Sequence, residues 1–282
     1  MGQSGRASVF CIIVTLLAAA CDRPAATPAR GGTIVSLSPA ATDLLLAMRL
    51  GDRLVGVSAY DHDPAVAGRL PVAGDYQKID WERLAVLRPS HLVVQGRADR
   101  LPPGLRERAA QIGCDVVNIQ IDRVDDVYRA IAQLGAALHA PDAAAAASTA
   151  LRGQMPAAAT GQSALLVIGD DGINVVGGNN YLDDLLTAAG GINVISAQGY
   201  VRLDQEKAQT LTPDVVFVLL PRAREAVVEK AVADLRGRFA GAKGPRVIAI
   251  TDADALLPAS NVGRLAQKFA QGLRPTTRPA AS

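Results

Sequence analysis

Three tyrosines stand where a predicted strand end or loop could present a ring to a ligand. Tyr60 ends the second of two apolar runs and is followed by Asp61 and His62, while Tyr76 and Tyr200 precede predicted helices. Aromatic residues make up only 4% of the chain, so an aromatic residue near a predicted loop is informative. A tyrosine ring buries a large apolar area with little loss of rotamer freedom, which suits contact with a flat ligand. Packing inside the fold is the alternative role for each ring.

Catalytic and metal chemistry find less support in the sequence. His62, His91 and His139 are far apart along the chain, whereas a zinc or manganese site needs histidines and carboxylates gathered together. The stretch VVGGNN lacks the lysine and the following serine or threonine of a phosphate-binding loop. The sequence contains no Gly-x-Ser-x-Gly nucleophile elbow. We therefore expect a protein that is not an enzyme and that has no intrinsic cofactor or metal site.

The composition indicates a folded protein without a strong electrostatic character. The chain has 282 residues, of which 49% are apolar, so it can bury a core without disulfides or metal. Its formal net charge is +2, and neither a basic patch nor an acidic tail stands out. Nucleic acid is therefore not expected as a partner.

The N-terminus is typical of an exported protein. Arg6 precedes an apolar run at 9–20, which has the length of a signal peptide and is shorter than the ~20 residues of a spanning helix. Small residues then lead into Cys21, which resembles the site where lipoproteins are cut and acylated. An ordinary secretory signal is the alternative. Asp22 resembles the inner-membrane retention signal of enteric lipoproteins.

Cysteine usage agrees with export. We expect a signal peptide at 1–20 that removes Cys11, and a Pro- and Ala-rich tether at 21–32 that starts with the acylated cysteine. Only Cys114 then remains as a thiol, so no internal disulfide can form. Because Cys114 opens a predicted strand, we expect it to be a small buried side chain.

Short β-rich runs alternate with helical stretches from Thr33 onward. The first unit has a strand at 33–37, a helix with Ser38 as N-cap and Pro39 in its first turn, and a strand at 54–57. Strands separated by helices predict parallel βαβ units, and their ligands bind beyond the carboxyl ends of the strands. Tyr60 lies just past such an end. The pattern continues with helices at 81–87 and 105–112 and strands at 92–94 and 116–119.

The segment from Val124 to Met155 contains no strand-like run and is rich in helix-forming residues. It predicts a linking helix of ~14 residues, about 21 Å long, with a second helix beginning at Pro141. β-like sequence resumes at Ser163, followed by helices at 181–189, 226–239 and 262–273 and strands at 215–219 and 247–250. We predict an α/β fold of two Rossmann-like lobes, 33–122 and 161–275, joined by a long linking helix within 123–160 and followed by a tail at 276–282.

Several spaced motifs resemble one protein family. The stretch TIVSLSPAATDLLLAMRLGDRLVGVSAYDHDP is similar to the opening of class III periplasmic binding proteins, which serve ABC importers. The likeness continues through LPVAGDYQKIDWERLAVLRPSHLVV, GGNNYLDDLLTAAGGINVIS and YVRLDQEKAQTLTPDVVFVL, and it covers nearly all of residues 33–273. The order and number of these motifs make the family assignment specific, whereas they leave the ligand open.

The resemblance implies a ligand held between two Rossmann-like lobes and a partner in the membrane. In this family one glutamate of each lobe docks on arginines of a permease dimer that works with an ATPase. Glu82 in DWERL and Glu206 in DQEKA occupy those motif positions, and a solvated helix charge is the alternative for each. The resemblance further implies a monomer in the periplasm, held at the inner membrane by its N-terminal lipid. A tethered ligand sensor without a permease is the alternative function.

The ligand class implied by the resemblance includes cobalamin, haem and ferric siderophores. Tyr60, Tyr76 and Tyr200 occupy positions that are aromatic in the cobalamin-binding member of the family. Gln95 stands where that member has a fourth aromatic residue, and this departure weakens the case for cobalamin.

Haem and siderophores need other residues. Tyr60, His62 or Tyr76 could coordinate the iron of haem, but the arginine that haem binders tend to place after their tyrosine is a lysine here. Anionic siderophores favour arginine, and three arginines lie on predicted loops. The predicted ligand-binding residues are Tyr60, Tyr76, Gln95, Arg97, Tyr200 and Arg202, with Arg100 more typical of an ordinary surface residue.

Overall fold

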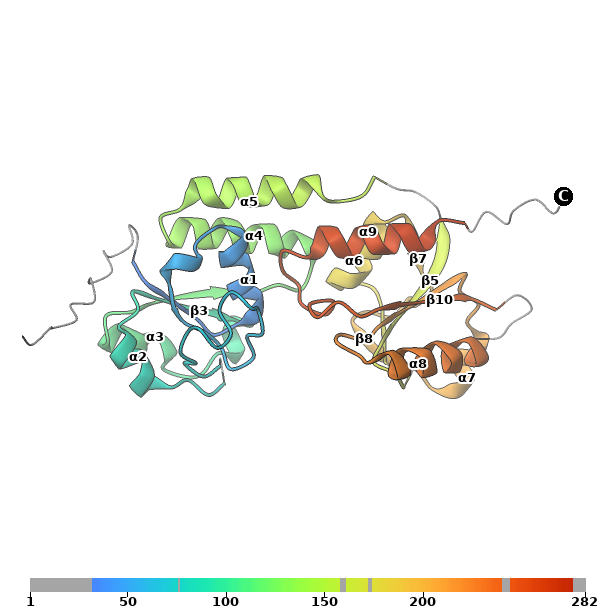
Figure 1. Ribbon diagram of the computed structural model, residues 1–282, viewed down its shortest axis with the longest axis horizontal. Coiled ribbons are helices and arrows are strands. Elements are labelled where there is room, and N and C mark those ends of the chain that lie inside the picture. The colour runs from blue at the N-terminus through green and yellow to red at the C-terminus, as the bar shows by residue number, and fades with distance from the viewer. Residues whose placement is uncertain (1–31, 76, 158–160, 172–173, 240–243, 276–282) are drawn as a thin grey trace, which may run out of the picture.

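Two α/β lobes lie side by side, and a pair of helices lies over the N-terminal lobe and extends toward the C-terminal lobe (Figure 1). The computed structural model describes residues 32–75, 77–157, 161–171, 174–239 and 244–275. The predicted signal peptide, Cys21 and Tyr76 lie outside these residues. The predicted architecture of two α/β lobes with a helical link is confirmed.

The N-terminal lobe is a four-stranded parallel sheet with strand order β2-β1-β3-β4. Parallel strands of this kind require helical crossovers, as the sequence predicted. The elements are β1 (Ile34–Ser36), α1 (Pro39–Ala47), a 3₁₀ turn η1 (Gly51–Arg53), β2 (Leu54–Gly56), α2 (Trp81–Leu87), β3 (His91–Gln95), a second 3₁₀ turn η2 (Ala98–Arg100), α3 (Leu105–Gln111) and β4 (Asp115–Ile119).

Local sequence sets where these helices begin. The Ser38 side chain accepts a hydrogen bond from the Ala41 backbone N–H at 3.3 Å, and Pro39 occupies the first helical position of α1. In α2 the Asp80 carboxylate accepts a hydrogen bond from the Arg83 backbone N–H at 2.8 Å. Both caps satisfy N–H groups that no helical carbonyl can reach.

The C-terminal lobe contains a six-stranded mixed sheet. Strands β10, β9, β5 and β7 are mutually parallel, whereas β6 is antiparallel to β5 and β8 is antiparallel to β6. The elements are β5 (Gln162–Ile168), β6 (Asn174–Val176), α6 (Tyr181–Ala188), β7 (Gly191–Asn193), β8 (Tyr200–Arg202), α7 (Gln205–Thr210), β9 (Val215–Leu219), α8 (Glu225–Arg238), β10 (Arg246–Ile250) and α9 (Val262–Leu273).

An antiparallel pair distinguishes the sheet of the second lobe from that of the first. Residues 169–173 are too few for the crossover that a parallel connection needs, so β6 folds back beside β5. β8 then pairs with β6, and the backbone before β8 lies close to the backbone after β6. The Gly177 N–H donates to the Gly199 carbonyl at 2.7 Å, and a Cβ on Gly177 would lie 1.9 Å from the Ala197 carbonyl oxygen. Glycine is therefore required where β8 is placed.

Alternating strand residues pack into different cores. In β9 the side chain of Phe217 faces α9, where its ring centroid lies 4.8 Å from that of Phe269. Val216 and Val218 face the other side of the sheet and pack with Leu235 of α8. This two-sided burial explains why β9 reads as a continuous apolar run. Cys114 is a free thiol and is buried as predicted, and burial raises its pKa to about 12.

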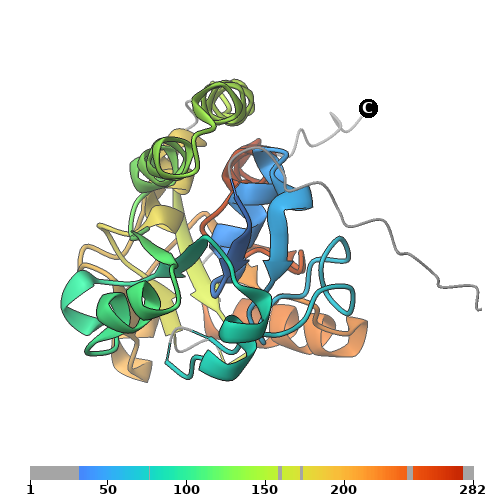
Figure 2. The same ribbon diagram turned by 90° about the vertical axis from the view of Figure 1, so that its left-hand side faces the viewer.

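The linking segment is a hairpin of two helices. α4 (Val124–Ala137) and α5 (Pro141–Gly153) lie side by side (Figures 1 and 2), over the N-terminal lobe, and they contact α6 and α9 of the C-terminal lobe. Gly135 allows this close approach, because a Cβ there would lie 2.4 Å from the Ala144 Cβ. The Arg152 guanidinium lies 3.8 Å from the centroid of the Tyr128 ring and so adds a cation–π contact between the two helices. The predicted linking helix therefore has a partner that stiffens it.

The hairpin is attached to both lobes. At its start, Arg123 bonds to Asp184 at the beginning of α6 in the C-terminal lobe. At its tip, the Arg53 guanidinium of the N-terminal lobe donates to the Leu138 carbonyl at 2.8 Å. Below the hairpin, one apolar cluster includes side chains from both lobes and from the hairpin itself, among them Leu44, Ile131, Leu134, Leu151 and Phe269. Relative movement of the lobes would therefore disturb a shared core.

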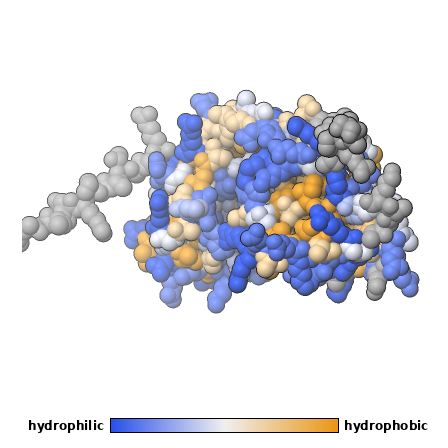
Figure 3. All heavy atoms as spheres, turned by 45° about the vertical axis from the view of Figure 1, so that its right-hand side comes forward, coloured by the Kyte–Doolittle hydropathy of each residue, from blue (hydrophilic) through white to orange (hydrophobic). Residues whose placement is uncertain are grey.

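Most of the face shown in Figure 3 is hydrophilic, and its most extensive apolar patch lies on the half formed by the C-terminal lobe. None of the helices in the described ranges is both long and apolar enough to cross a membrane.

Candidate functional site

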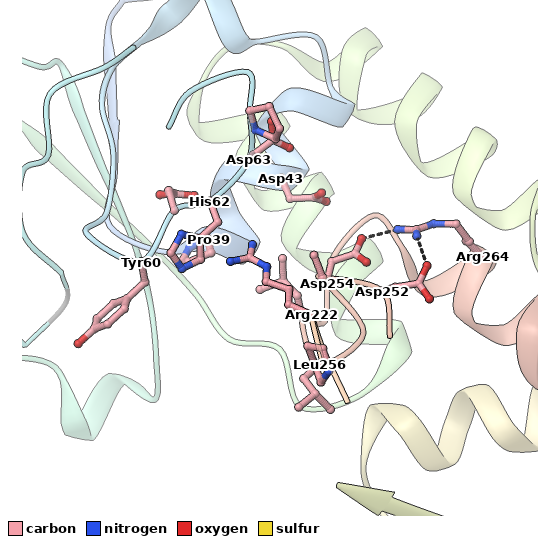
Figure 4. A pocket seen from close by; sticks show the side chains of 15 residues that line it. Pro39, Asp43, Tyr60, His62, Asp63, Arg222, Asp252, Asp254, Leu256 and Arg264 are labelled. Carbon is pink, nitrogen blue, oxygen red and sulfur yellow. Dashed lines mark hydrogen bonds and ion pairs between the residues drawn. The ribbon is translucent and has the colours of Figure 1, made fainter. Parts of the chain in front are cut away.

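The larger of two neighbouring hollows lies between the lobes and has a volume of about 510 Å³ (Figure 4). Its N-terminal wall comes from the start of α1 and the loop after β2, and its C-terminal wall comes from the loops after β9 and β10. Both walls thus follow the carboxyl ends of strands, where ligands of α/β sheets bind. The residues that line it are Pro39, Asp43, Tyr60, Asp61, His62, Asp63, Pro64, Pro221, Arg222, Asp252, Ala253, Asp254, Leu256, Leu257 and Arg264.

The second hollow, of about 370 Å³, lies along the carboxyl ends of the N-terminal strands. It is lined by residues after β1, β3 and β4, including Leu37, Gln95 and Ile121. Pro39 and Tyr60 line both hollows, so the two spaces are adjacent at these residues. We treat the two hollows together as the candidate site and call them the cleft.

Tyr60 is the ring at the junction of the two spaces. It is 62% exposed, so most of its ring is available to a ligand. Its backbone N–H donates to the Ser58 hydroxyl at 3.1 Å, so the turn after β2 is fixed while the ring stays free. This combination of a rigid base and an open ring suits contact with a ligand.

The buried carboxylate of Asp61 holds this turn in place. It accepts hydrogen bonds from the Ser58 backbone N–H at 2.9 Å and from the Thr42 hydroxyl of α1 at 3.1 Å. Burial raises the pKa of Asp61, and these hydrogen bonds partly offset that effect. Asp61 thereby ties the loop that carries Tyr60 and His62 to the first helix.

Asp43 connects the two lobes at the edge of the cleft. Its carboxylate accepts a hydrogen bond from the Ser260 backbone N–H at 2.8 Å, across 217 positions of sequence. Burial raises the pKa of Asp43, and the hydrogen bond from Ser260 opposes that effect. The closeness of the two lobes at this point is therefore maintained by a specific polar contact.

The C-terminal wall carries a local network of opposite charges. The guanidinium of Arg264 in α9 pairs with Asp252 at 2.8 Å and with Asp254, and Lys268 pairs with Asp252 at 2.5 Å. These contacts, two of them shown as dashed lines in Figure 4, partner the carboxylates of the loop after β10. The network fixes that loop against α9.

Two of the predicted ligand-binding residues line the second hollow besides Tyr60. The Gln95 side-chain carbonyl accepts a hydrogen bond from the Ser38 hydroxyl at 2.5 Å, at the point where β3 ends. Arg97 also lines this hollow, but its guanidinium pairs with Asp99 at 3.2 Å, and the hydrogen bond to Asp99 raises the pKa of Arg97. Arg100 lines the same hollow and is exposed.

The other two described members of the predicted set lie elsewhere. Tyr200 and Arg202 are exposed residues of the edge strand β8, and neither is among the described residues that line the two hollows. Their predicted role therefore stays a prediction. Glu82 in α2 and Glu206 in α7 are both exposed, one on each lobe, near the N-terminus of its helix.

Sequence reasoning missed several polar residues of the cleft, among them Asp43, Asp254 and Arg222. The sequence analysis gave none of these three residues a role. A signal for Arg222 was present, because it follows β9 as Tyr60 follows β2. Applying the rule of carboxyl strand ends to the second lobe would have identified it.

The larger hollow combines apolar and polar surface, which suits the binding of a small molecule. Apolar surface from Tyr60, Leu256 and Leu257 adjoins polar side chains, most of which already have hydrogen-bond or ion-pair partners. Within the described part of the chain, no group of three or more His, Cys, Asp or Glu side chains could hold a metal ion. His62 and Tyr60 could each offer one ligand to a metal that arrives within a larger molecule.

Comparison with known proteins adds independent evidence. A family model for periplasmic binding proteins matches residues 34–234. A vitamin B12-binding protein of Vibrio parahaemolyticus is 28% identical over 192 residues, which are 65% of this chain and 69% of that protein. A periplasmic haem-binding protein of Vibrio cholerae has a similar structure, with a TM-score of 0.69 and 26% identity over 86% of this chain and 99% of that one. The periplasmic vitamin B12 binding protein of Vibrio cholerae, at 20% identity and a TM-score of 0.67, covers 86% of this chain and 97% of its own, and supports the fold.

Proposed function

Because the chain belongs to the periplasmic binding protein family, we propose that it captures a corrinoid such as cobalamin in the cleft between its lobes and delivers it to an ABC importer. Support for the ligand class comes from the relatives named for vitamin B12 and from the similar structures of vitamin B12 and haem binders. In this role the predicted lobes, 33–122 and 161–275, would enclose the ligand from two sides.

The observation that carries the proposal is the exposed ring of Tyr60 where the two hollows meet. A hollow of about 510 Å³ beside a second one of about 370 Å³ offers enough volume for part of a macrocycle. Tyr60 can cover the flat face of such a ring, and Leu256 and Leu257 add apolar surface from the opposite lobe.

Haem is the second candidate, and a specific observation favours it. Tyr60 and His62 line the same hollow, and either side chain is a known type of iron ligand. A ferric siderophore is a third possibility within the family, but Arg97, one of the arginines predicted to hold it, is paired with Asp99.

Absorption titration tests the proposal directly. The purified chain without its signal peptide is titrated with cyanocobalamin, haem and a ferric siderophore, and the spectrum of each ligand is recorded. We expect a saturable change with one stoichiometric equivalent of a corrinoid or of haem. If none of the three spectra changes at micromolar protein, the proposed function is wrong.

Delivery to a permease assigns a role to the two exposed glutamates. Charge reversal, Glu82→Lys or Glu206→Lys, should leave ligand affinity within about twofold and reduce uptake by cells severalfold, since rim charges orient partners more than they hold ligands. The reversal Glu107→Lys, on the exposed face of α3, is a matched control. A large loss of affinity in the purified variants would place these glutamates in ligand binding instead.

The N-terminal segment, which lies outside the described residues, bears on where in the cell the protein acts. We propose export to the periplasm and attachment to the inner membrane through lipid on Cys21. Cys21→Ser should release the protein from washed membranes, and unchanged membrane association would contradict the lipid anchor.

A further inference from the structure

Arg222 differs from the other charged side chains that line the larger hollow, because they already have partners. Asp61 is held by Ser58 and Thr42, Asp43 by Ser260, and Asp63 by the Ala65 backbone N–H at 2.7 Å. Asp252, Asp254 and Arg264 form one network. Among the described residues, the Arg222 guanidinium makes no hydrogen bond or ion pair, although its side chain lines the hollow.

The backbone of Arg222 is also unusual. Its φ of +60° lies in the left-handed region, which non-glycine residues seldom adopt. Arg49, Arg88 and His139 share this conformation, but they follow the last turns of helices, where it is common. Arg222 instead follows a strand. Strained residues of this kind are concentrated at ligand-binding sites.

The turn that carries Arg222 is well fixed. The Arg222 N–H donates to the Thr251 carbonyl at 3.1 Å, and the Ala223 N–H donates to the Leu220 carbonyl at 3.1 Å. Figure 4 shows the guanidinium directed from the C-terminal lobe toward Pro39 and His62 of the N-terminal lobe. The charge is thus presented across the space that a ligand would occupy.

We infer that Arg222 determines specificity by receiving an anionic group of the ligand, a carboxylate or a phosphate. The guanidinium matches such groups with two parallel hydrogen bonds. The inference rests on the proposed function, since it concerns the ligand of the same cleft. The shared chemistry has two sources among the candidates: the phosphodiester of cobalamin and the propionates of haem.

Matched ligand pairs separate these sources. Cyanocobalamin is compared with dicyanocobinamide, which lacks the phosphodiester, and haem is compared with its dimethyl ester, in which both carboxylates are masked. Each ligand is titrated by absorbance against the purified chain without its signal peptide, and against the same chain carrying Arg222→Gln or Arg224→Gln. Arg224 is an exposed arginine two residues further on that does not line the hollow and has an ordinary φ of −73°.

The unchanged chain should prefer the anionic member of one pair by about tenfold, and this preference should shrink as salt is added. Arg222→Gln should abolish the preference while binding the masked ligand as before, and Arg224→Gln should keep it. Retention of the preference in Arg222→Gln overturns the inference, and so does an unchanged chain that binds both members of its pair equally. If the unchanged chain binds none of the four ligands, the proposed function fails, and the inference fails with it.

Discussion

Replacing Tyr60 with alanine should weaken ligand binding by about 1–3 kcal/mol, or roughly five- to 150-fold. The ring is 62% exposed at the junction of the two hollows, so its apolar face becomes buried only when a ligand arrives. Each Å² of apolar surface that it covers contributes ~25 cal/mol, and association costs absorb part of that gain. Absorption titration of Tyr60→Ala with cobalamin and with haem measures the loss.

Because Tyr60 is exposed, its effect on ligand affinity can be measured separately from its effect on the free energy of unfolding. Because the ring makes few contacts in the free protein, Tyr60→Ala should change the free energy of unfolding by less than ~0.5 kcal/mol. Ile192→Ala, which truncates another exposed apolar side chain outside the cleft, should affect neither quantity. Tyr60→Phe distinguishes the ligands: stacking on a corrin survives the change, whereas a phenolate ligand to haem iron is lost and the iron spectrum shifts. Equal affinity of Tyr60→Ala and the unchanged chain would remove Tyr60 from the site.

Replacing Asp184 with alanine should lower the free energy of unfolding by about 2–3 kcal/mol, because it detaches the start of the helical hairpin from the C-terminal lobe. The Asp184 carboxylate accepts hydrogen bonds from two nitrogens of Arg123, one of them at 2.8 Å, and from the Val124 backbone N–H at 3.0 Å. The Asp184 side chain is only 20% exposed, so water replaces these bonds poorly. Urea denaturation of Asp184→Ala measures the loss. Asp170→Ala, which truncates an exposed aspartate of the same lobe, is the control.

The same contact bears on how the protein responds to its ligand. The hairpin is fixed to both lobes and shares their core, so we expect small-angle scattering of the unchanged chain to be nearly the same with and without ligand. Asp184→Asn, which keeps an acceptor for the Val124 N–H, should lose less stability than Asp184→Ala. If Asp184→Ala is as stable as the unchanged chain, the hairpin is held mainly by its apolar contacts and this account of the anchor is wrong.

Much of the fold could be predicted from the sequence because it depends on neighbours along the chain. Ser38 and Pro39 mark the start of α1, because the Ser38 side chain accepts a hydrogen bond from a free backbone N–H and Pro39 has no N–H that needs a partner. The helix α2 has the predicted bounds of 81–87. The alternation of apolar runs and helices predicted the parallel N-terminal sheet, since parallel strands need long crossovers. The position of Tyr60 at the cleft followed from the same rule about strand ends.

The tertiary structure alone decided the partners that lie far apart in sequence. Periodicity cannot show that Asp43 meets Ser260 across 217 positions, or that Arg123 starts the hairpin against Asp184. It also could not show that Arg222, after β9, would face the N-terminal lobe across the larger hollow. The sequence determined the elements and the family, since helix caps and the periodic burial of side chains depend on residues that are close together along the chain. The charge pattern of the cleft arises only when two separately folded sheets bring their strand ends together.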